Sequence, residues 1–140
     1  MFTFGWFSSG RDQAAIDLFK AAADRLASGF IPGRLAYVFC DRAPGETAAS
    51  DRFLAAVEAR GVTRVTHSSG KLRSLIKARV PELEAFREAF DAQVIAKLTG
   101  YEAEMAVLAG YMLIASPLLC RALLCLNLHP AVPGGACRRI

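Results

Sequence analysis

The sequence predicts a doubly wound α/β fold with a mainly parallel sheet. Short apolar runs alternate with amphipathic helical segments along the whole chain, which is typical of right-handed βαβ units. These runs are apolar on both faces, as strands buried between two layers of helices are. The length of 140 residues suits one domain and excludes two full ones.

The composition predicts a globular protein without a membrane segment. Hydrophobic residues make up 54% of the chain and charged residues 21%, so there is enough apolar material for a core and too little charge for disorder. The net charge of +4 is scattered along the chain, which favours anionic ligands weakly and predicts no nucleic-acid partner. The longest uncharged stretch, Met105 to Cys120, is shorter than the roughly 20 residues that a bilayer demands.

The cysteines predict a reduced, cytoplasmic protein. No two of them have the CxxC spacing of a metal or redox motif, and no secretion signal precedes them. They are Cys40, Cys120, Cys125 and Cys137. We therefore expect no metal site.

The N-terminal half predicts two βα units and a third strand. A strand over Phe2 to Phe7 stops at a Ser-Ser-Gly turn, and apolar residues at helical spacing predict a helix from Gln13 to Leu26. A second strand follows from Leu35 to Cys40. The next helix runs from Ser50, its expected N-cap, to about Ala59. A short third strand covers Val62 to Thr66.

The C-terminal half continues the alternation after a segment expected to be a surface loop, His67 to Lys71. Pro81 predicts the start of a long helix that reaches about Leu98. A strand over Met105 to Leu108, a short helix over Ser116 to Leu123 and a strand over Leu124 to Leu128 follow. The strand at Phe2 to Phe7 is expected to lie centrally in a sheet of about five strands.

The turn after the first strand is a candidate anion site. In sheets of this type ligands bind beyond the carboxyl ends of the strands. The turn Ser8 to Gln13 leads directly into a helix, whose N-terminal N–H groups and dipole favour an anion such as phosphate. The turn has one glycine and matches neither GxGxxG nor the P-loop. A plain turn with Asp12 as the N-cap is the alternative interpretation.

The end of the last strand holds a second candidate site. In Asn127-Leu128-His129-Pro130, the single intervening residue places Asn127 and His129 on the same face of an extended strand. An amide donor beside an imidazole can stabilise an oxyanion and move a proton near neutral pH. The alternative is a structural histidine packed beside Pro130.

Three segments together resemble the folate-dependent formyltransferases. They are Phe7 to Arg11 (FSSGR), Val107 to Pro117 (VLAGYMLIASP) and Leu126 to Gly134 (LNLHPAVPG), in the order of that family. The resemblance covers nearly the whole chain. It implies the Rossmann-like formyltransferase fold and transfer of a formyl group from 10-formyltetrahydrofolate to the primary amine of glycinamide ribonucleotide, in purine biosynthesis.

The resemblance also implies roles for single residues. Asn127 and His129 would be catalytic, stabilising the tetrahedral oxyanion and moving a proton. The residues implied for the ribonucleotide phosphate are Ser9, Gly10, Arg11, Asp12, Gln13 and Arg87. Those implied for the folate are Met112, Leu113 and Ile114, largely through backbone groups. For Arg87, a position on the solvent-exposed face of its helix, without a role in phosphate binding, is an equal alternative.

The chain departs from the family's pattern at the phosphate turn. Relatives usually carry a further glycine and a Ser-Asn pair after Ser9-Gly10, whereas this chain has Arg11, Asp12 and Gln13. A carboxylate thus stands where a phosphate is expected. Leu113 also occupies a position that is often arginine in relatives.

The family's catalytic aspartate lies in a later loop, and the chain ends at Ile140 before it. We therefore expect that the C-terminal strands are missing, that an exposed sheet edge permits self-association, and that the isolated chain has little activity. Two alternatives are a catalytically silent remnant that binds folate or phosphate, and hydrolysis of formyltetrahydrofolate.

Overall fold

The sheet has five strands, all parallel, in the order β3-β2-β1-β4-β5. The computed structural model describes residues 1–128. The strands are β1 (Phe2–Ser8), β2 (Gly33–Cys40), β3 (Arg64–Thr66), β4 (Met105–Ala109) and β5 (Cys125–Leu128). The predicted doubly wound α/β fold and the central position of β1 are both confirmed.

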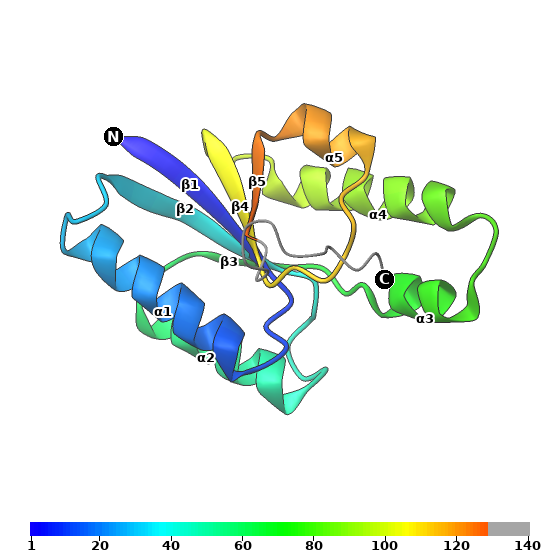
Figure 1. Cartoon of the computed structure of the whole chain (residues 1–140), viewed down its shortest axis with the longest axis horizontal. Coiled ribbons are helices and arrows are strands. Elements are labelled where there is room, and N and C mark those ends of the chain that lie inside the picture. The colour runs from blue at the N-terminus through cyan, green and yellow to red at the C-terminus, as the bar shows by residue number, and fades with distance from the viewer. Residues whose placement is uncertain (129–140) are drawn as a thin grey trace, which may run out of the picture.

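Helices cover both faces of the sheet (Figure 1). The helices α1 (Gln13–Ala27) and α2 (Ala48–Ala59) lie on one face. The helices α3 (Gly70–Ala78), α4 (Leu83–Leu98) and α5 (Pro117–Ala122) lie on the other. Among residues 1–128, no helix combines the length and the apolar character needed to cross a bilayer.

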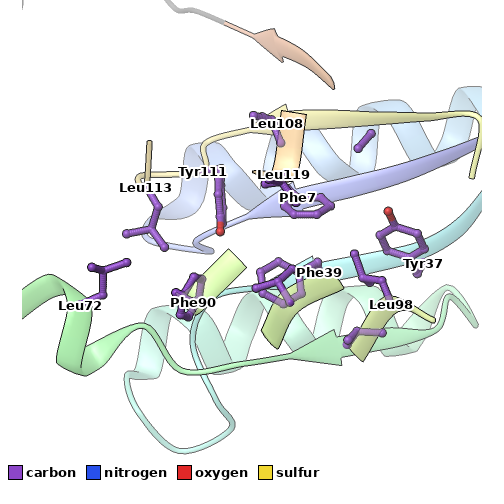
Figure 2. Close-up of a cluster of buried hydrophobic side chains, with 13 residues drawn as sticks. Phe7, Tyr37, Phe39, Leu72, Phe90, Leu98, Leu108, Tyr111, Leu113 and Leu119 are labelled. Atoms are coloured by element: carbon purple, nitrogen blue, oxygen red, sulfur yellow. The ribbon is translucent and has the colours of Figure 1, made fainter. Parts of the chain in front are cut away.

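Alternating side chains of the central strand divide the core into two halves. Trp6 packs on the side of α1 and α2, and its neighbour Phe7 packs on the opposite side. The Phe7 ring centroid lies 5.0 Å from that of Phe39 and 5.4 Å from that of Tyr111. Figure 2 shows these three rings together with Phe90 of α4. Both halves of the core therefore fix the strands whose carboxyl ends carry the candidate sites.

Two local details differ from the sequence predictions. The N-cap of α2 is Thr47, not Ser50, because the Thr47 hydroxyl accepts a hydrogen bond from the Ser50 N–H at 3.0 Å. The segment expected to be a loop, His67 to Lys71, runs into helix α3 at Gly70, and its residue Ser69 is buried. Only Leu72 of α3 is fully buried, so the apolar signal for this short helix is weak in the sequence.

A partly buried ionic network holds α3 at the carboxyl end of β2. Asp41, which is fully buried, accepts a hydrogen bond from Ser69 Oγ at 2.5 Å. Arg73 Nη1 lies 3.5 Å from Asp41 Oδ2, and Arg73 Nη2 lies 2.9 Å from Glu46 Oε2. Arg73 also donates to Ser69 Oγ. One guanidinium thus joins α3 to the two loops that surround it.

Gly5 lies opposite Tyr37 in the β1–β2 ladder, where no larger residue fits. A Cβ atom at this position would overlap the buried Tyr37 ring. We expect Gly5→Ala to lower the free energy of unfolding by about 1–3 kcal/mol through overpacking. Urea denaturation measures this. The control Gly70→Ala introduces a methyl group at ordinary contact distance and should cause no loss; equal effects of the two changes would contradict the prediction.

Candidate functional site

A cleft of about 560 Å³ lies at the carboxyl end of the sheet, where the loops after β1 and β4 meet the end of β5. The chain leaves β1 towards α1 on one face and leaves β4 towards α5 on the other, so the cleft lies at the switch point of the sheet. The residues that line it are Arg11, Asp12, Ala14, Ala15, Leu18, Gly110, Tyr111, Met112, Asn127 and Leu128. The structure therefore brings the turn after β1, the loop after β4 and the last two residues of β5 to one site.

Ser9 joins two of these loops. It is fully buried, its N–H donates to the Gly110 carbonyl at 3.0 Å, and its hydroxyl accepts from the Met112 N–H at 2.9 Å. These bonds fix the turn after β1 against the loop after β4. The Ser9 side chain thus lies beneath the cleft, not among the residues that line it.

Gly10 shapes the turn in a different way. Its φ of +57° is a conformation that favours glycine, and a Cβ atom here would press on Phe53 of α2. Its N–H donates to Ser8 Oγ at 3.1 Å. Both Ser9 and Gly10 therefore use their N–H groups inside the protein.

Asp12 is the N-cap of α1, as the plain-turn interpretation predicted. Its backbone is extended, and Oδ1 accepts a hydrogen bond from the Ala15 N–H at 3.0 Å. The side chain of Gln13 donates to Asp17 at 2.9 Å. Arg11 is exposed, and its Nη1 lies 3.5 Å from Met112 Sδ. A guanidinium and a carboxylate thus both line the cleft.

The three residues predicted for folate differ in exposure. Met112 and Ile114 are 49% and 65% exposed, whereas Leu113 is buried in the core beside α3 and α4. The loop is held at its far end by Asp91, whose Oδ2 accepts a hydrogen bond from the Ser116 N–H at 2.7 Å. The sequence analysis did not single out Asp91, although a carboxylate on the apolar face of a helix is an available signal.

Tyr111, which also lines the cleft, stays neutral. Burial raises the pKa of its phenol well above the usual range, and the nearby carboxylates of Asp41 and Asp91 raise it further. Its ring packs against Phe7. The phenol therefore contributes no anion to the cleft.

The remaining predicted residues lie in different places. Asn127, on strand β5, is exposed and lines the cleft together with Arg11 and Asp12. His129 lies outside the described residues. Arg87 is on α4 and pairs with Glu84 at 2.7 Å. It is not among the residues of 1–128 that line the cleft.

Removing the Ser9 hydroxyl should loosen the cleft. We expect Ser9→Ala to lower the free energy of unfolding by about 0.5–1.5 kcal/mol, because the hydrogen bond from the Met112 N–H to the buried Ser9 hydroxyl is lost. Urea denaturation measures the loss, and hydrogen exchange at the Met112 amide should become faster. The control Ser74→Ala removes an exposed hydroxyl from α3. Unchanged exchange at Met112 would contradict the role given to Ser9.

Comparison with known proteins identifies the fold. No family model and no curated protein matches the chain. Among solved structures, glycinamide ribonucleotide transformylase 1 from Symbiobacterium toebii matches 94% of this chain with 29% identity and a TM-score of 0.64. Phosphoribosylglycinamide formyltransferase from Bacillus halodurans matches 91% with 19% identity and a TM-score of 0.66.

A third solved structure is PvdF of pyoverdin biosynthesis, an N10-formyltetrahydrofolate-dependent formyltransferase, with 16% identity over 93% of this chain and a TM-score of 0.62. The chain spans 53%, 56% and 62% of the length of these three proteins, in the order given. Over nearly all of its length, this chain has the fold of the phosphoribosylglycinamide formyltransferases.

Proposed function

We propose that this chain takes part in formyl transfer from 10-formyltetrahydrofolate to a primary amine. The observation that supports this is the cleft at the switch point, where an amide side chain, an exposed guanidinium, an exposed carboxylate and the loop after β4 meet in a domain with the formyltransferase fold. Glycinamide ribonucleotide is the acceptor for which the Symbiobacterium toebii enzyme is named. We take it as the reference acceptor, with cytoplasmic purine biosynthesis as its setting.

The proposed reaction needs a donor for an oxyanion and a carrier for one proton. The amine nitrogen attacks the formyl carbon, a new C–N bond forms, and the bond from that carbon to N10 of the folate then breaks. The proton leaves the amine and is delivered to N10. Asn127 would donate its amide N–H to the oxyanion of the tetrahedral intermediate, and His129 would carry the proton.

The two substrates would occupy different walls of the cleft. We assign the folate to the backbone of Met112 to Ile114 and the acceptor to the turn from Ser9 to Gln13. Within that turn, Ser9 and Gly10 would act by shaping the loop, since both are buried and bonded internally. Arg11 would contact the acceptor, and Arg87 would reach its phosphate only if the acceptor extends past the cleft towards α4.

The test is a single-turnover assay on the full chain with 10-formyltetrahydrofolate and glycinamide ribonucleotide. The expected result is formylated ribonucleotide, detected by mass spectrometry, in an amount equal to the folate consumed. Formate without a formylated amine would indicate hydrolysis, and folate binding without turnover would indicate a silent remnant. Either outcome, or a lack of folate binding, would refute the proposal.

A further inference from the structure

We infer that Asp12 is a specificity-determining residue, which selects a primary amine carrying at most one negative charge near the β1–α1 turn. This inference rests on the proposed formyl transfer but concerns only the choice of acceptor. It implies that a doubly charged phosphate monoester gains little or nothing from this turn. Glycinamide ribonucleotide would then be a poor acceptor compared with an amine that carries a carboxylate or no acid group.

The first argument is that several N–H groups around the turn are used inside the protein. A phosphate at such a turn is held by backbone N–H groups that have no partner in the protein. Here the N–H of Ser9 bonds to Gly110, that of Gly10 to Ser8, and that of Ala15 to Asp12. Three backbone donors around the turn are therefore occupied.

The second argument is the charge beside the turn. Asp12 places a carboxylate in the cleft wall, and a phosphate monoester carries a charge of about −1.5 to −2 at pH 7. A dianion at this position would therefore meet a like charge at the start of α1.

The third argument is the geometry of the one cation in the wall. Arg11 is exposed and touches Met112 Sδ through Nη1, so its remaining N–H groups can face a ligand. A single guanidinium matches the charge and the planar shape of one carboxylate, which it binds with two parallel hydrogen bonds. Arg11 and Asp12 together thus suit a singly charged or zwitterionic acceptor.

The test compares glycinamide ribonucleotide with its dephosphorylated ribonucleoside, using isothermal titration of the full chain at pH 7.5. Asp12→Asn removes the charge and keeps a good N-cap. Asp17→Asn is the matched control, since it removes the same charge from α1 outside the cleft. Repeating the titrations in 1 M salt separates charge repulsion, which is then screened, from a change of structure.

We expect the wild-type chain to bind the two compounds with dissociation constants within about threefold of each other. Asp12→Asn should bind the ribonucleotide about tenfold more tightly than wild type, with the ribonucleoside unchanged, because the repulsion between the Asp12 carboxylate and the phosphate dianion is removed. Asp17→Asn should bind both compounds as wild type does. High salt should bring the dissociation constants of wild type and Asp12→Asn for the ribonucleotide closer together.

A wild-type chain that prefers the ribonucleotide about a hundredfold, or an Asp12→Asn variant without the gain, would overturn the inference. No binding of either compound by any of the three proteins would overturn it too, because Asp12→Asn should create phosphate affinity. Failure of the proposed function looks different. In that case folate fails to bind, or no amine of either charge class is formylated.

Discussion

Replacing Arg73 by methionine is expected to lower the free energy of unfolding by about 3–5 kcal/mol. Asp41 is fully buried, and the Arg73 guanidinium is the cation beside it, 3.5 Å from Oδ2. Methionine keeps much of the apolar stem but leaves the carboxylate without a counter-charge. A buried charge that loses its partner costs far more than an exposed one, since water cannot replace the lost interaction.

Urea denaturation of Arg73→Met and Arg64→Met provides the measurement and its control. Arg64 forms a more exposed pair with Glu58 at 3.5 Å, and its loss should cost less than about 1 kcal/mol. The double variant Arg73→Met with Asp41→Asn should recover part of the stability, because the unpaired charge is gone. Equal effects of Arg73→Met and Arg64→Met would show that the network contributes no more than a surface pair.

Glu46 makes the stability lost in Arg73→Met depend on pH. Burial opposes ionisation of Glu46, but hydrogen bonds from Ser68, Ala43 and Arg73 outweigh it and hold the pKa below the usual 4.5. A lowered pKa in the folded state stabilises the protein above the unfolded value, and this stabilisation disappears as the pH falls through the folded value. The difference in free energy of unfolding between wild type and Arg73→Met should therefore become smaller below pH 4.5.

Replacing Asn127 by alanine is expected to slow single-turnover formyl transfer by about 10²–10³-fold, the cost of losing one oxyanion donor. Asn127 lines the cleft from β5. The interaction would exist mainly in the transition state, so the acceptor concentration that gives half-maximal rate should change little. Asn127 is exposed, and its loss should leave the unfolding midpoint unchanged.

Gln93→Ala is the control for this experiment, because it removes an amide from the exposed surface of α4, where Gln93 Oε1 lies 2.6 Å from His67. Rates are followed by quenched-flow with mass-spectrometric detection of the formylated amine. A rate for Asn127→Ala within about threefold of wild type would exclude Asn127 as the oxyanion donor.

The sequence predicted the elements that are apolar over most of their length. The strands β1, β2 and β4 are buried on both faces, so each appears as a continuous apolar run. Helix α3 was missed because tertiary contacts of Arg73 and Ser69, not an apolar face, hold it in place. The N-cap of α2 was misplaced by three residues, since Thr47 and Ser50 are both good capping residues and only the backbone geometry decides between them.

The site was predictable as a location but not in its details. The rule that ligands bind at strand ends places the turn after β1 and Asn127 at one edge of the sheet. The role of Ser9 depends on Met112, which is 103 residues away along the chain, and no local pattern reports such a contact. The position of Arg87 away from the cleft likewise depends on which face of the sheet α4 covers.

The central position of β1 has a consequence for synthesis on the ribosome. Its partner β2 follows within about 25 residues, but its other partner β4 begins only at Met105. Because the chain is synthesised at about 5–20 residues per second, the second edge of β1 stays unpaired for on the order of 5–20 s, until β4 has been made. During that interval the nascent chain presents Trp6 and Phe7 on a strand with one unpaired edge, which favours chaperone binding and aggregation.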